Sequence, residues 1–289
     1  MASYKGVPTI RKRLVGSQLA RLRKACGLSV EEAAAEMGVG AFTVRRQESG
    51  ETAVSVADAK AYADIYQVED GDARERLLNL AKHGRTRGWW TGFDRTVGPA
   101  AIDLADAEDL ATGVKTWHPC VIPGLLQTRE YSAAVIEVRR SLGEAEEVLA
   151  ADGFLELRER RKEVLRREKP PHLWAIIGEA AILTEVGGKA VMDGQLRHLL
   201  NVAELPHVSI QMLPFSAGAH AGMSGPFMVM SFDATLDGGI VFLENAGGNA
   251  FSDDPLEARQ RTDRFAHLQA QALSVAETRR YLLRAISAK

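Results

Sequence analysis

The sequence predicts a multidomain protein, in which an all-α N-terminal domain is followed by an α+β C-terminal domain. Its 289 residues are enough for two domains of ordinary size. The first third carries short helical patterns separated by glycine, whereas the remainder mixes short apolar runs with long charged helical patterns. These differences predict three parts, which are a basic arm at 1–13, a helical domain with a connector helix at 14–84, and an α+β domain at 85–289.

The composition is that of an ordinary globular protein, with 46% hydrophobic and 26% charged residues. No apolar run approaches the roughly 20 residues that span a bilayer, so we expect a cytoplasmic protein without a membrane partner. Cys26 and Cys120 are the only cysteines, and they match no metal-binding spacing. We therefore expect two reduced, partly buried thiols.

Positive charge is concentrated near the N-terminus, ahead of the first acidic residue, Glu31. The residues concerned are Lys5, Arg11, Lys12, Arg13, Arg21, Arg23 and Lys24. On a chain whose net charge is −2, such a local block suits a protein that touches phosphates at one end only. A solubilising tail is the alternative. We expect the arm to be mobile and to bring Arg11, Lys12 and Arg13 to phosphates or to the minor groove.

Residues 28–50 contain two short helical patterns joined by a glycine corner. Ser29 is expected to cap the first helix, with Glu32 at the spacing of a capping box. Gly38 provides the positive φ needed where the chain leaves that helix, and the next helix is expected at 41–49. A short turn containing glycine between two helices is the geometry that sets a helix into a DNA major groove. Further helices are expected at 15–26, 56–65 and 70–83.

Residues 14–68 resemble the helix-turn-helix module of phage-repressor-type transcription factors, also called the xenobiotic-response-element (XRE) family. The matching residues are Leu19, Leu22, Arg23, Gly27, Leu28, Ser29, Ala34, Gly38, Val39, Val44, Glu48 and Gly50. The resemblance implies that double-stranded DNA is a partner. It also implies an ion pair between Arg23 and Glu48 that fixes the first helix to the end of the third.

By the same resemblance, Ala41, Phe42 and Arg46 occupy base-reading positions. Arg46 suits two hydrogen bonds to guanine, and the two apolar residues suit a thymine methyl group. The complete predicted DNA-contacting set is Arg11, Lys12, Arg13, Ser29, Val30, Gly40, Ala41, Phe42, Arg45 and Arg46. Gln47 lies where the family usually buries an apolar residue, an exchange that would loosen the packing of this helix. The alternative is a helical module that has lost DNA affinity and only dimerises.

The C-terminal two-thirds of the chain predicts a mixture of strands and helices. Strands are expected at 113–117, 172–177, 208–213, 227–232 and 240–244. Helices are expected at 128–141, 144–168, 189–203, 255–272 and 274–287. The last two strands are separated by a glycine-containing loop, which predicts a hairpin.

An ordered set of motifs gives this part of the chain a resemblance of its own. The motifs begin at Gly88, Pro123, Leu157, Glu179, Leu196, Leu213, Gly225 and Val241. Together they resemble the C-terminal domain of many actinobacterial helix-turn-helix regulators, long catalogued as a domain of unknown function and often labelled antitoxin-like (the Scr1 type). The resemblance implies a transcriptional regulator, which we expect to be a homodimer, whose C-terminal domain senses an unknown small-molecule effector or a small protein encoded by a neighbouring gene. The alternative is an antitoxin-like protein that mainly binds the small partner and autoregulates its own operon.

The sequence shows no constellation of catalytic residues. A nucleophile elbow, a pair of histidines at i and i+4, a cysteine pair and a nucleotide fingerprint are all missing, so we expect no enzyme, no cofactor and no metal. The candidate ligand-binding residues are Trp90, Trp117, His118, Glu179, His220 and Glu244, and each has a purely structural alternative. An enzyme would be favoured if Glu179, His220 and Glu244 met in one dry pocket. Helix capping or an ion pair with Arg158 or Arg161 is the alternative for the glutamates.

Overall fold

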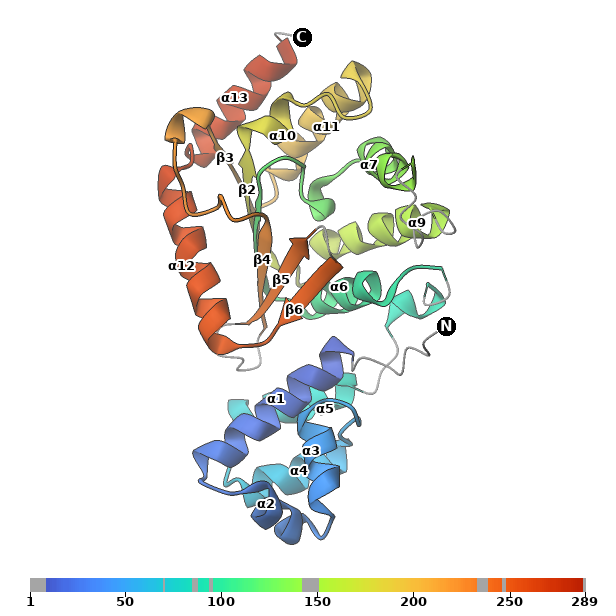
Figure 1. The fold of residues 1–289 in the computed structure, drawn as a ribbon, viewed down its shortest axis with the longest axis vertical. Coiled ribbons are helices and arrows are strands. Elements are labelled where there is room, and N and C mark those ends of the chain that lie inside the picture. The colour runs from blue at the N-terminus through green and yellow to red at the C-terminus, as the bar shows by residue number, and fades with distance from the viewer. Residues whose placement is uncertain are drawn as a thin grey trace. The chain divides into compact units, whose positions relative to one another are not determined.

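The structure, a computed structural model, describes residues 9–69, 71–84, 88–93, 96–141, 151–232, 239–245 and 248–287. The described chain forms two compact units (Figure 1). The first contains the described residues up to Thr91 together with Phe232, and the second contains the other described residues from Gly92 onward. No helix in these ranges is both long enough and apolar enough to cross a membrane. The predicted partial burial of the two thiols is wrong, because Cys26 and Cys120 are free and exposed.

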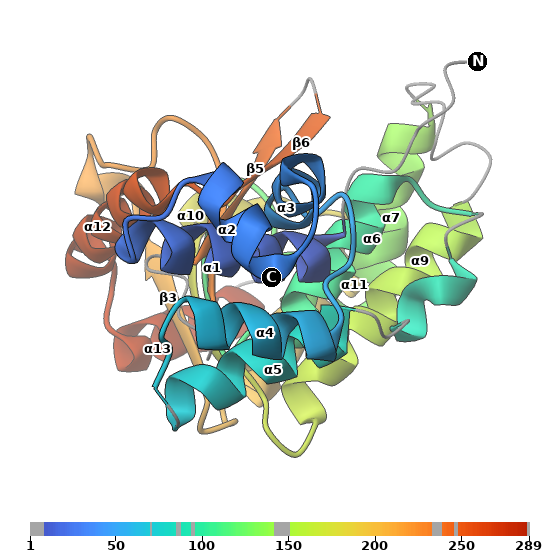
Figure 2. The same ribbon diagram turned by 90° about the horizontal axis from the view of Figure 1, so that it is seen from below.

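The regular elements of the first unit, in its described residues, are all helices, as predicted. Its helices are α1 (Ile10–Ala25), α2 (Val30–Met37), α3 (Ala41–Glu48), α4 (Val56–Ile65) and α5 (Asp72–Gly84). In Figure 2, α2 lies beside α3 and α4 lies beside α5. The predicted mobile arm is wrong at its C-terminal end, because residues 10–13 form the first turn of α1. Residues 1–8 of that arm lie outside the described residues.

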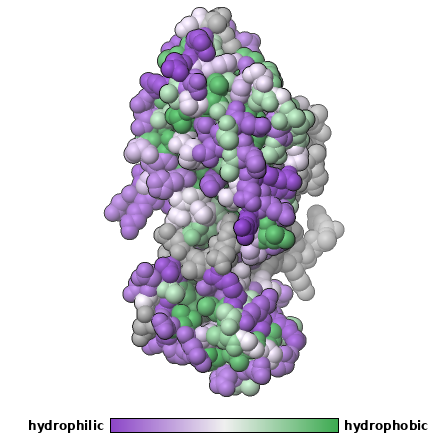
Figure 3. Space-filling view, turned by 90° about the vertical axis from the view of Figure 1, so that its left-hand side faces the viewer, coloured by the Kyte–Doolittle hydropathy of each residue, from purple (hydrophilic) through white to green (hydrophobic). Residues whose placement is uncertain are grey.

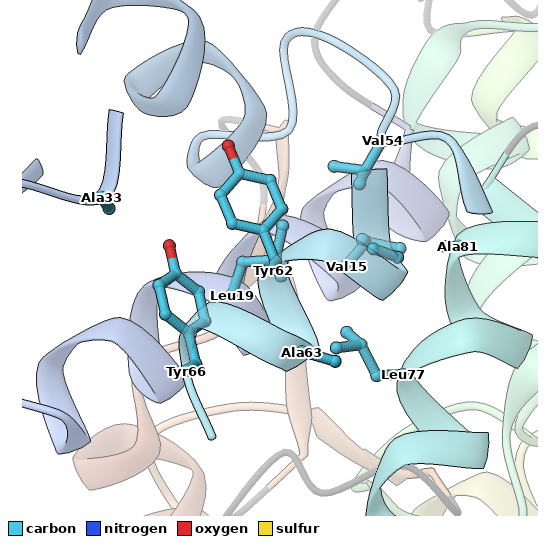
Figure 4. Close-up of a cluster of buried hydrophobic side chains, with 10 residues drawn as sticks. Val15, Leu19, Ala33, Val54, Tyr62, Ala63, Tyr66, Leu77 and Ala81 are labelled. Atoms are coloured by element: carbon cyan, nitrogen blue, oxygen red, sulfur yellow. The ribbon is translucent and has the colours of Figure 1, made fainter. Parts of the chain in front are cut away.

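The core of the first unit is built around two tyrosines, Tyr62 of α4 and Tyr66 directly after that helix. The rings of Tyr62 and Tyr66 stack with centroids 5.4 Å apart, and Figure 4 shows the two side chains among the other buried residues of the cluster. Val15 and Leu19 of α1 and Leu77 of α5 pack against this pair, and all are buried. Helices of this length are marginal alone in water, so the shared apolar core must stabilise them.

Two glycines allow α1 to approach the C-terminal end of α3 closely. A Cβ atom at Gly16 would lie 2.4 Å from the carbonyl oxygens of both Gln47 and Glu48. Gly50, with φ +76°, would bring a Cβ atom to 2.8 Å from the backbone nitrogen of Arg13. The absence of side chains at these positions is therefore what sets the spacing between the two helices.

The second unit is built on one mixed sheet of six strands within the described residues. The strands are β1 (Gly113–His118), β2 (His172–Gly178), β3 (Val208–Leu213), β4 (Phe227–Ser231), β5 (Ile240–Asn245) and β6 (Gly248–Ser252). Their spatial order is β3-β2-β1-β4-β5-β6, with β1, β2 and β3 parallel and the remaining pairs antiparallel. The predicted antiparallel pairing of β4 with β5 is confirmed, and β6 was not predicted.

Helices cover both faces of this sheet. They are α6 (Pro99–Leu110), α7 (Arg129–Ser141), α9 (Ala151–Arg161), α10 (Glu179–Leu183), α11 (Lys189–Val202), α12 (Pro255–Gln271) and α13 (Val275–Ser287). In Figure 1, α12 lies on one side of the sheet and α6, α7 and α9 on the other. Of the predicted helix at 144–168, the structure describes α9 and a 3-10 turn at Lys162–Arg166, while residues 142–150 lie outside the described residues. The predicted architecture of an all-α part followed by an α+β part is confirmed.

The side chains of the sheet alternate between the two faces. Trp117, Phe227 and Val241 point toward α12 and pack with its Phe265 and Leu268. Figure 3 views the molecule from the α12 side, where hydrophilic residues are interspersed with smaller hydrophobic areas. Residues one position away along the strands, such as His118, Met228 and Phe242, face α6 and α9 instead.

We expect Gly16→Ala to destabilise the first unit by about 1–3 kcal/mol, because the new methyl group overlaps backbone oxygens that cannot move independently. Gly194→Ala in α11 is the matched control, since nothing lies within 4 Å of its Cβ position, and it should stabilise by about 0.5–1 kcal/mol. Urea unfolding of the full chain, followed by circular dichroism, measures both. An unchanged midpoint for Gly16→Ala would contradict the close approach of α1 to α3.

Candidate nucleic-acid interface and C-terminal cavity

The start of α2 carries the predicted capping box. The Ser29 hydroxyl accepts a hydrogen bond from the Glu32 backbone N–H at 3.1 Å, and a Glu32 carboxylate oxygen accepts one from the Ser29 N–H at 2.8 Å. The hydrogen bonds that the Glu32 carboxylate accepts from the Ser29 backbone N–H and from the Ser29 hydroxyl lower the pKa of Glu32 below its ordinary value. The helix ends at Gly38 with φ +66°, a conformation that glycine adopts without strain. The two signals read from the sequence therefore define α2 at both ends.

The ion pair between Arg23 and Glu48 is confirmed. The guanidinium donates to both carboxylate oxygens, at 2.7 and 2.9 Å, and a third donor reaches the Leu28 carbonyl at 2.7 Å. The two side chains are only 9% and 11% exposed. One side chain of α1 therefore holds both the entry to α2 and the end of α3.

One face of α3 is presented to solvent. Phe42 is 70% exposed, and the side chains of Arg45 and Arg46 are 61% and 45% exposed. Val44 and Gln47 on the opposite face are buried. Positions separated by three or four residues share one side of a helix, so Phe42, Arg45 and Arg46 form a continuous surface, which we call the α3 face.

The arginines of the α3 face are held by weak contacts. Arg45 pairs with Glu31, and Arg46 lies 3.3 Å from Glu51 and 5.6 Å from the Phe42 ring centroid. Both ion pairs lie in water-accessible surroundings, where such pairs contribute about 0–1 kcal/mol. Both guanidinium groups can therefore exchange these partners for others at small cost.

The expected loosening of α3 by Gln47 is wrong. Its side-chain oxygen accepts a 2.6 Å hydrogen bond from the Tyr62 hydroxyl, and both residues are buried. Burial, with smaller contributions from Glu48 and Asp58, raises the pKa of Tyr62 to about 12, so the hydroxyl keeps its proton. The buried amide thus has a partner on α4, and it ties α3 to the core instead of disrupting it.

The remaining predicted DNA contacts differ in exposure. Ser29 and Gly40 are exposed, whereas Val30, Lys12 and Arg13 are partly buried. The structure does not support a DNA contact by Arg11, whose residue is only 6% exposed. Its guanidinium lies 4.7 Å from the ring centroid of Trp90, in a cation–π contact. Arg11 therefore serves the packing of the first unit.

The six candidate ligand residues are not brought together. Trp90 belongs to the first unit. Trp117 donates to the Gly222 carbonyl at 3.0 Å, and the His220 ring packs edge-on against it with centroids 5.3 Å apart. Both lie on the α12 side of the sheet, with structural roles.

Glu179 is also separate from the other candidates. Its carboxylate accepts hydrogen bonds from the Phe215 N–H and from the Tyr281 hydroxyl, both at 2.7 Å. Glu179, His220 and Glu244 therefore do not form the shared pocket that would favour acid–base chemistry. The described residues contain no group of three or more metal-binding side chains.

His118 and Glu244 do share a cavity, of about 460 Å³, between the sheet and helices α6 and α9. His118 ends β1, and Glu244 lies on β5. Two arginines of α9, Arg158 and Arg161, also line it. The volume lies within the range typical of small-molecule sites. We call this space the C-terminal cavity.

A buried ion pair that was not predicted supports one wall of this cavity. Arg161 donates to both oxygens of Glu108 in α6, at 2.6 and 2.7 Å, and the two side chains are 10% and 1% exposed. Burial alone lowers the pKa of Arg161, but the carboxylates of Glu108 and Glu244 raise it above its ordinary value. The sequence offered no signal that these two residues, on separate helices, would meet.

The loop after β1 is fixed by buried amides. Gln127 donates to the Ile122 carbonyl at 2.7 Å and accepts from Arg158 at 3.1 Å. Gln195 of α11 donates to the Leu126 carbonyl and accepts from the Thr128 N–H, both at 2.7 Å. These contacts anchor residues 123–128, the Pro-Gly-Leu-Leu-Gln-Thr motif, at the rim of the C-terminal cavity.

His118 is held in an unfavourable setting for a charged imidazole. Burial lowers its pKa below the ordinary value of 6.5, an effect that Glu244 partly opposes. Its Nδ1 atom is buried and has no hydrogen-bond partner among the described residues. The ring is therefore neutral at physiological pH.

The contact between Gln47 and Tyr62 generates a double-mutant test. We expect Tyr62→Phe to destabilise by about 1–3 kcal/mol, because it leaves the buried Gln47 oxygen without a donor. Adding Gln47→Leu should restore most of the loss, since two apolar groups then face each other. Urea unfolding of the single and double variants measures this coupling. A double variant no more stable than Tyr62→Phe alone would contradict it.

The lowered pKa of His118 predicts a pH dependence of stability. Below about pH 6.5 the unfolded chain binds a proton at this imidazole that the folded chain does not, so stability falls as the pH falls. We expect His118→Leu to lose less stability between pH 7.5 and 5.5 than the unaltered chain, by up to about 1.4 kcal/mol. His267→Leu, at an exposed histidine, is the matched control for the loss of an imidazole. Equal slopes for His118→Leu and the unaltered chain would contradict the assignment.

Two family models match this chain. A helix-turn-helix domain matches residues 14–77, which supports a DNA-binding regulator. A domain of unknown function (DUF5753) matches residues 101–284. No curated protein and no solved structure matches the chain. Because the second match covers more than half of the sequence, the chain belongs to the DUF5753 family, and it carries a helix-turn-helix domain ahead of the family's domain.

Proposed function

We propose that this protein is a sequence-specific DNA-binding transcriptional regulator that reads duplex DNA with the α3 face. The single observation that carries this proposal is the exposure of Phe42 beside Arg45 and Arg46 on a helix whose other side is buried. An exposed aromatic ring alone carries little information. Two arginines lie on the same face, and this face belongs to the second helix of a helix-turn-helix, the helix that enters the major groove of DNA.

The proposed contacts follow from the chemistry of the major groove. Arg46 donates two hydrogen bonds to guanine O6 and N7, and Ala41 and Phe42 contact thymine methyl groups. Arg45, one residue closer to the N-terminus than Arg46, takes a phosphate or a neighbouring base. Lys12 and Arg13 in the first turn of α1 take phosphates, which position the protein without reading sequence.

The exposed ion pairs of the α3 face favour this exchange of partners. Arg46 gives up its 3.3 Å contact with Glu51 and gains a bidentate pair with a base. The lost contact contributes about 0–1 kcal/mol, whereas a good bidentate contact discriminates by about 1–3 kcal/mol. The difference supports specific binding in spite of the acidic neighbours Glu31 and Glu51.

We further propose that two copies act together on DNA. Helix-turn-helix dimers place their reading helices about 34–36 Å apart in successive major grooves. The C-terminal domain would control this spacing, since an effector acts only by binding one arrangement better than another. Membership of the XRE and Scr1-type families, a small protein partner and an antitoxin-like role rest on sequence resemblance alone and stay predictions. No catalytic role is proposed.

The test begins with selection of bound duplexes from a random pool by the full chain, followed by titration of the selected duplex. We expect Arg46→Ala to weaken binding by about 1–3 kcal/mol and to relax the preference at one base pair. Lys60→Ala, which removes the same charge from the exposed side of α4, is the matched control and should leave that preference unchanged. Fluorescence anisotropy at fixed salt measures both.

Two results would contradict the proposal. The first is the enrichment of no sequence over the random pool. The second is a loss of affinity in Arg46→Ala that is equal on all duplexes, which would show a phosphate contact in place of a base contact.

A further inference from the structure

The C-terminal cavity contains a buried polar atom that the protein does not satisfy. His118 is only 8% exposed, and its Nδ1 atom has no hydrogen-bond partner among the described residues. The great majority of buried polar atoms in folded proteins have such a partner. His118 lines the cavity, so a group placed inside the cavity is able to supply the missing hydrogen bond.

Both arginines that line the cavity already have partners. Arg161 is neutralised by both oxygens of Glu108, and Arg158 donates to Gln127 at 3.1 Å. Glu244 supplies a negative charge on the same cavity wall. Positive and negative charges are therefore balanced, and the cavity offers no surplus charge to a charged ligand.

Apolar side chains line part of the remaining wall. Leu104 of α6, Phe154 of α9, and Met228 and Phe242 of the sheet line the same space. Apolar walls contribute roughly 25 cal/mol for each Å² of apolar ligand surface removed from water. A volume of about 460 Å³ is large enough for a molecule of two or three fused or linked rings, on the scale of known ligand pockets.

We propose that the C-terminal cavity binds an uncharged small molecule, which has an apolar body and one hydrogen-bonding group directed at Nδ1 of His118. The first turn of α6 forms part of the wall, and α6 is the first helix of the second unit along the chain. This ligand would be the effector of the regulator proposed above, so its biological role rests on that proposed function. The binding site itself does not depend on that role.

The test uses N-phenyl-1-naphthylamine, an uncharged fluorescent probe with an apolar body and a single N–H group. We expect saturable binding of this probe to the full chain. Its sulfonated relative, 1-anilinonaphthalene-8-sulfonate, has the same ring system with a negative charge. It should bind at least 10-fold more weakly, because the cavity has no unpaired cation to receive it.

Two substitutions test the location of the site. Ala101→Phe fills the cavity from α6 and should weaken probe binding at least 10-fold, whereas Ala190→Phe on the exposed side of α11 is the matched control and should not.

His118→Leu keeps a similar volume and should weaken binding about 3- to 10-fold, the range expected for one hydrogen bond. It should also leave the melting temperature equal or higher, because an unsatisfied buried atom is removed. If the role of His118 were purely structural, His118→Leu would lower the melting temperature.

Each outcome is decisive. Absence of saturable probe binding, or equal binding by the unaltered chain and both cavity variants, would overturn the proposal and leave a cavity that holds only water. Equal or tighter binding of the sulfonated probe would overturn the assignment of an uncharged ligand. The titrations contain no DNA, so a chain that binds DNA but not the probe refutes this inference alone. A chain that binds the probe but no duplex refutes only the proposed function.

Discussion

The orientation of α3 depends on the ion pair between Arg23 and Glu48. A planar guanidinium that meets both carboxylate oxygens fixes the distance between α1 and the end of α3, and it also fixes their relative rotation. The third donor, on the Leu28 carbonyl, extends this control to the start of α2. Both charges are largely removed from water, so desolvation offsets much of their attraction. The contribution of the pair is therefore geometric, and it decides which side of α3 remains in water.

A second buried pair has the corresponding position in the C-terminal unit. Glu108 and Arg161 join α6 to α9, and these two helices form one wall of the C-terminal cavity. Because each charge satisfies the other, this ion pair is complete without a ligand. His118 is the exception, since its buried Nδ1 atom has no partner among the described residues. Natural proteins tolerate such a cost mainly where a site needs the unsatisfied group.

The parts of the structure that the sequence predicted are those governed by local rules. The capping box of Ser29, the corner at Gly38 and the first five strands each depend on a few adjacent residues.

The features that the sequence did not predict depend on contacts between distant parts of the chain. Gly248–Ser252 contains no β-branched residue and becomes β6 only by pairing with β5. Arg11 is buried because Trp90, far along the chain, covers it. The amide of Gln47 is accepted in the core because Tyr62 donates to it. The C-terminal cavity combines residues of α6, α9 and four strands, so no single motif could indicate it.

The most direct test of the account is hydroxyl-radical footprinting of the full chain with and without its selected duplex, read by mass spectrometry at single side chains. Phe42, which is 70% exposed, should be oxidised readily in the free protein and protected in the complex. Phe215 and Met223 in the second unit are 66% and 72% exposed and provide internal standards, whose oxidation should not change. Protection confined to Phe42 is the predicted result. Oxidation of Phe42 at the same rate in both samples would contradict the claim that the α3 face reads DNA.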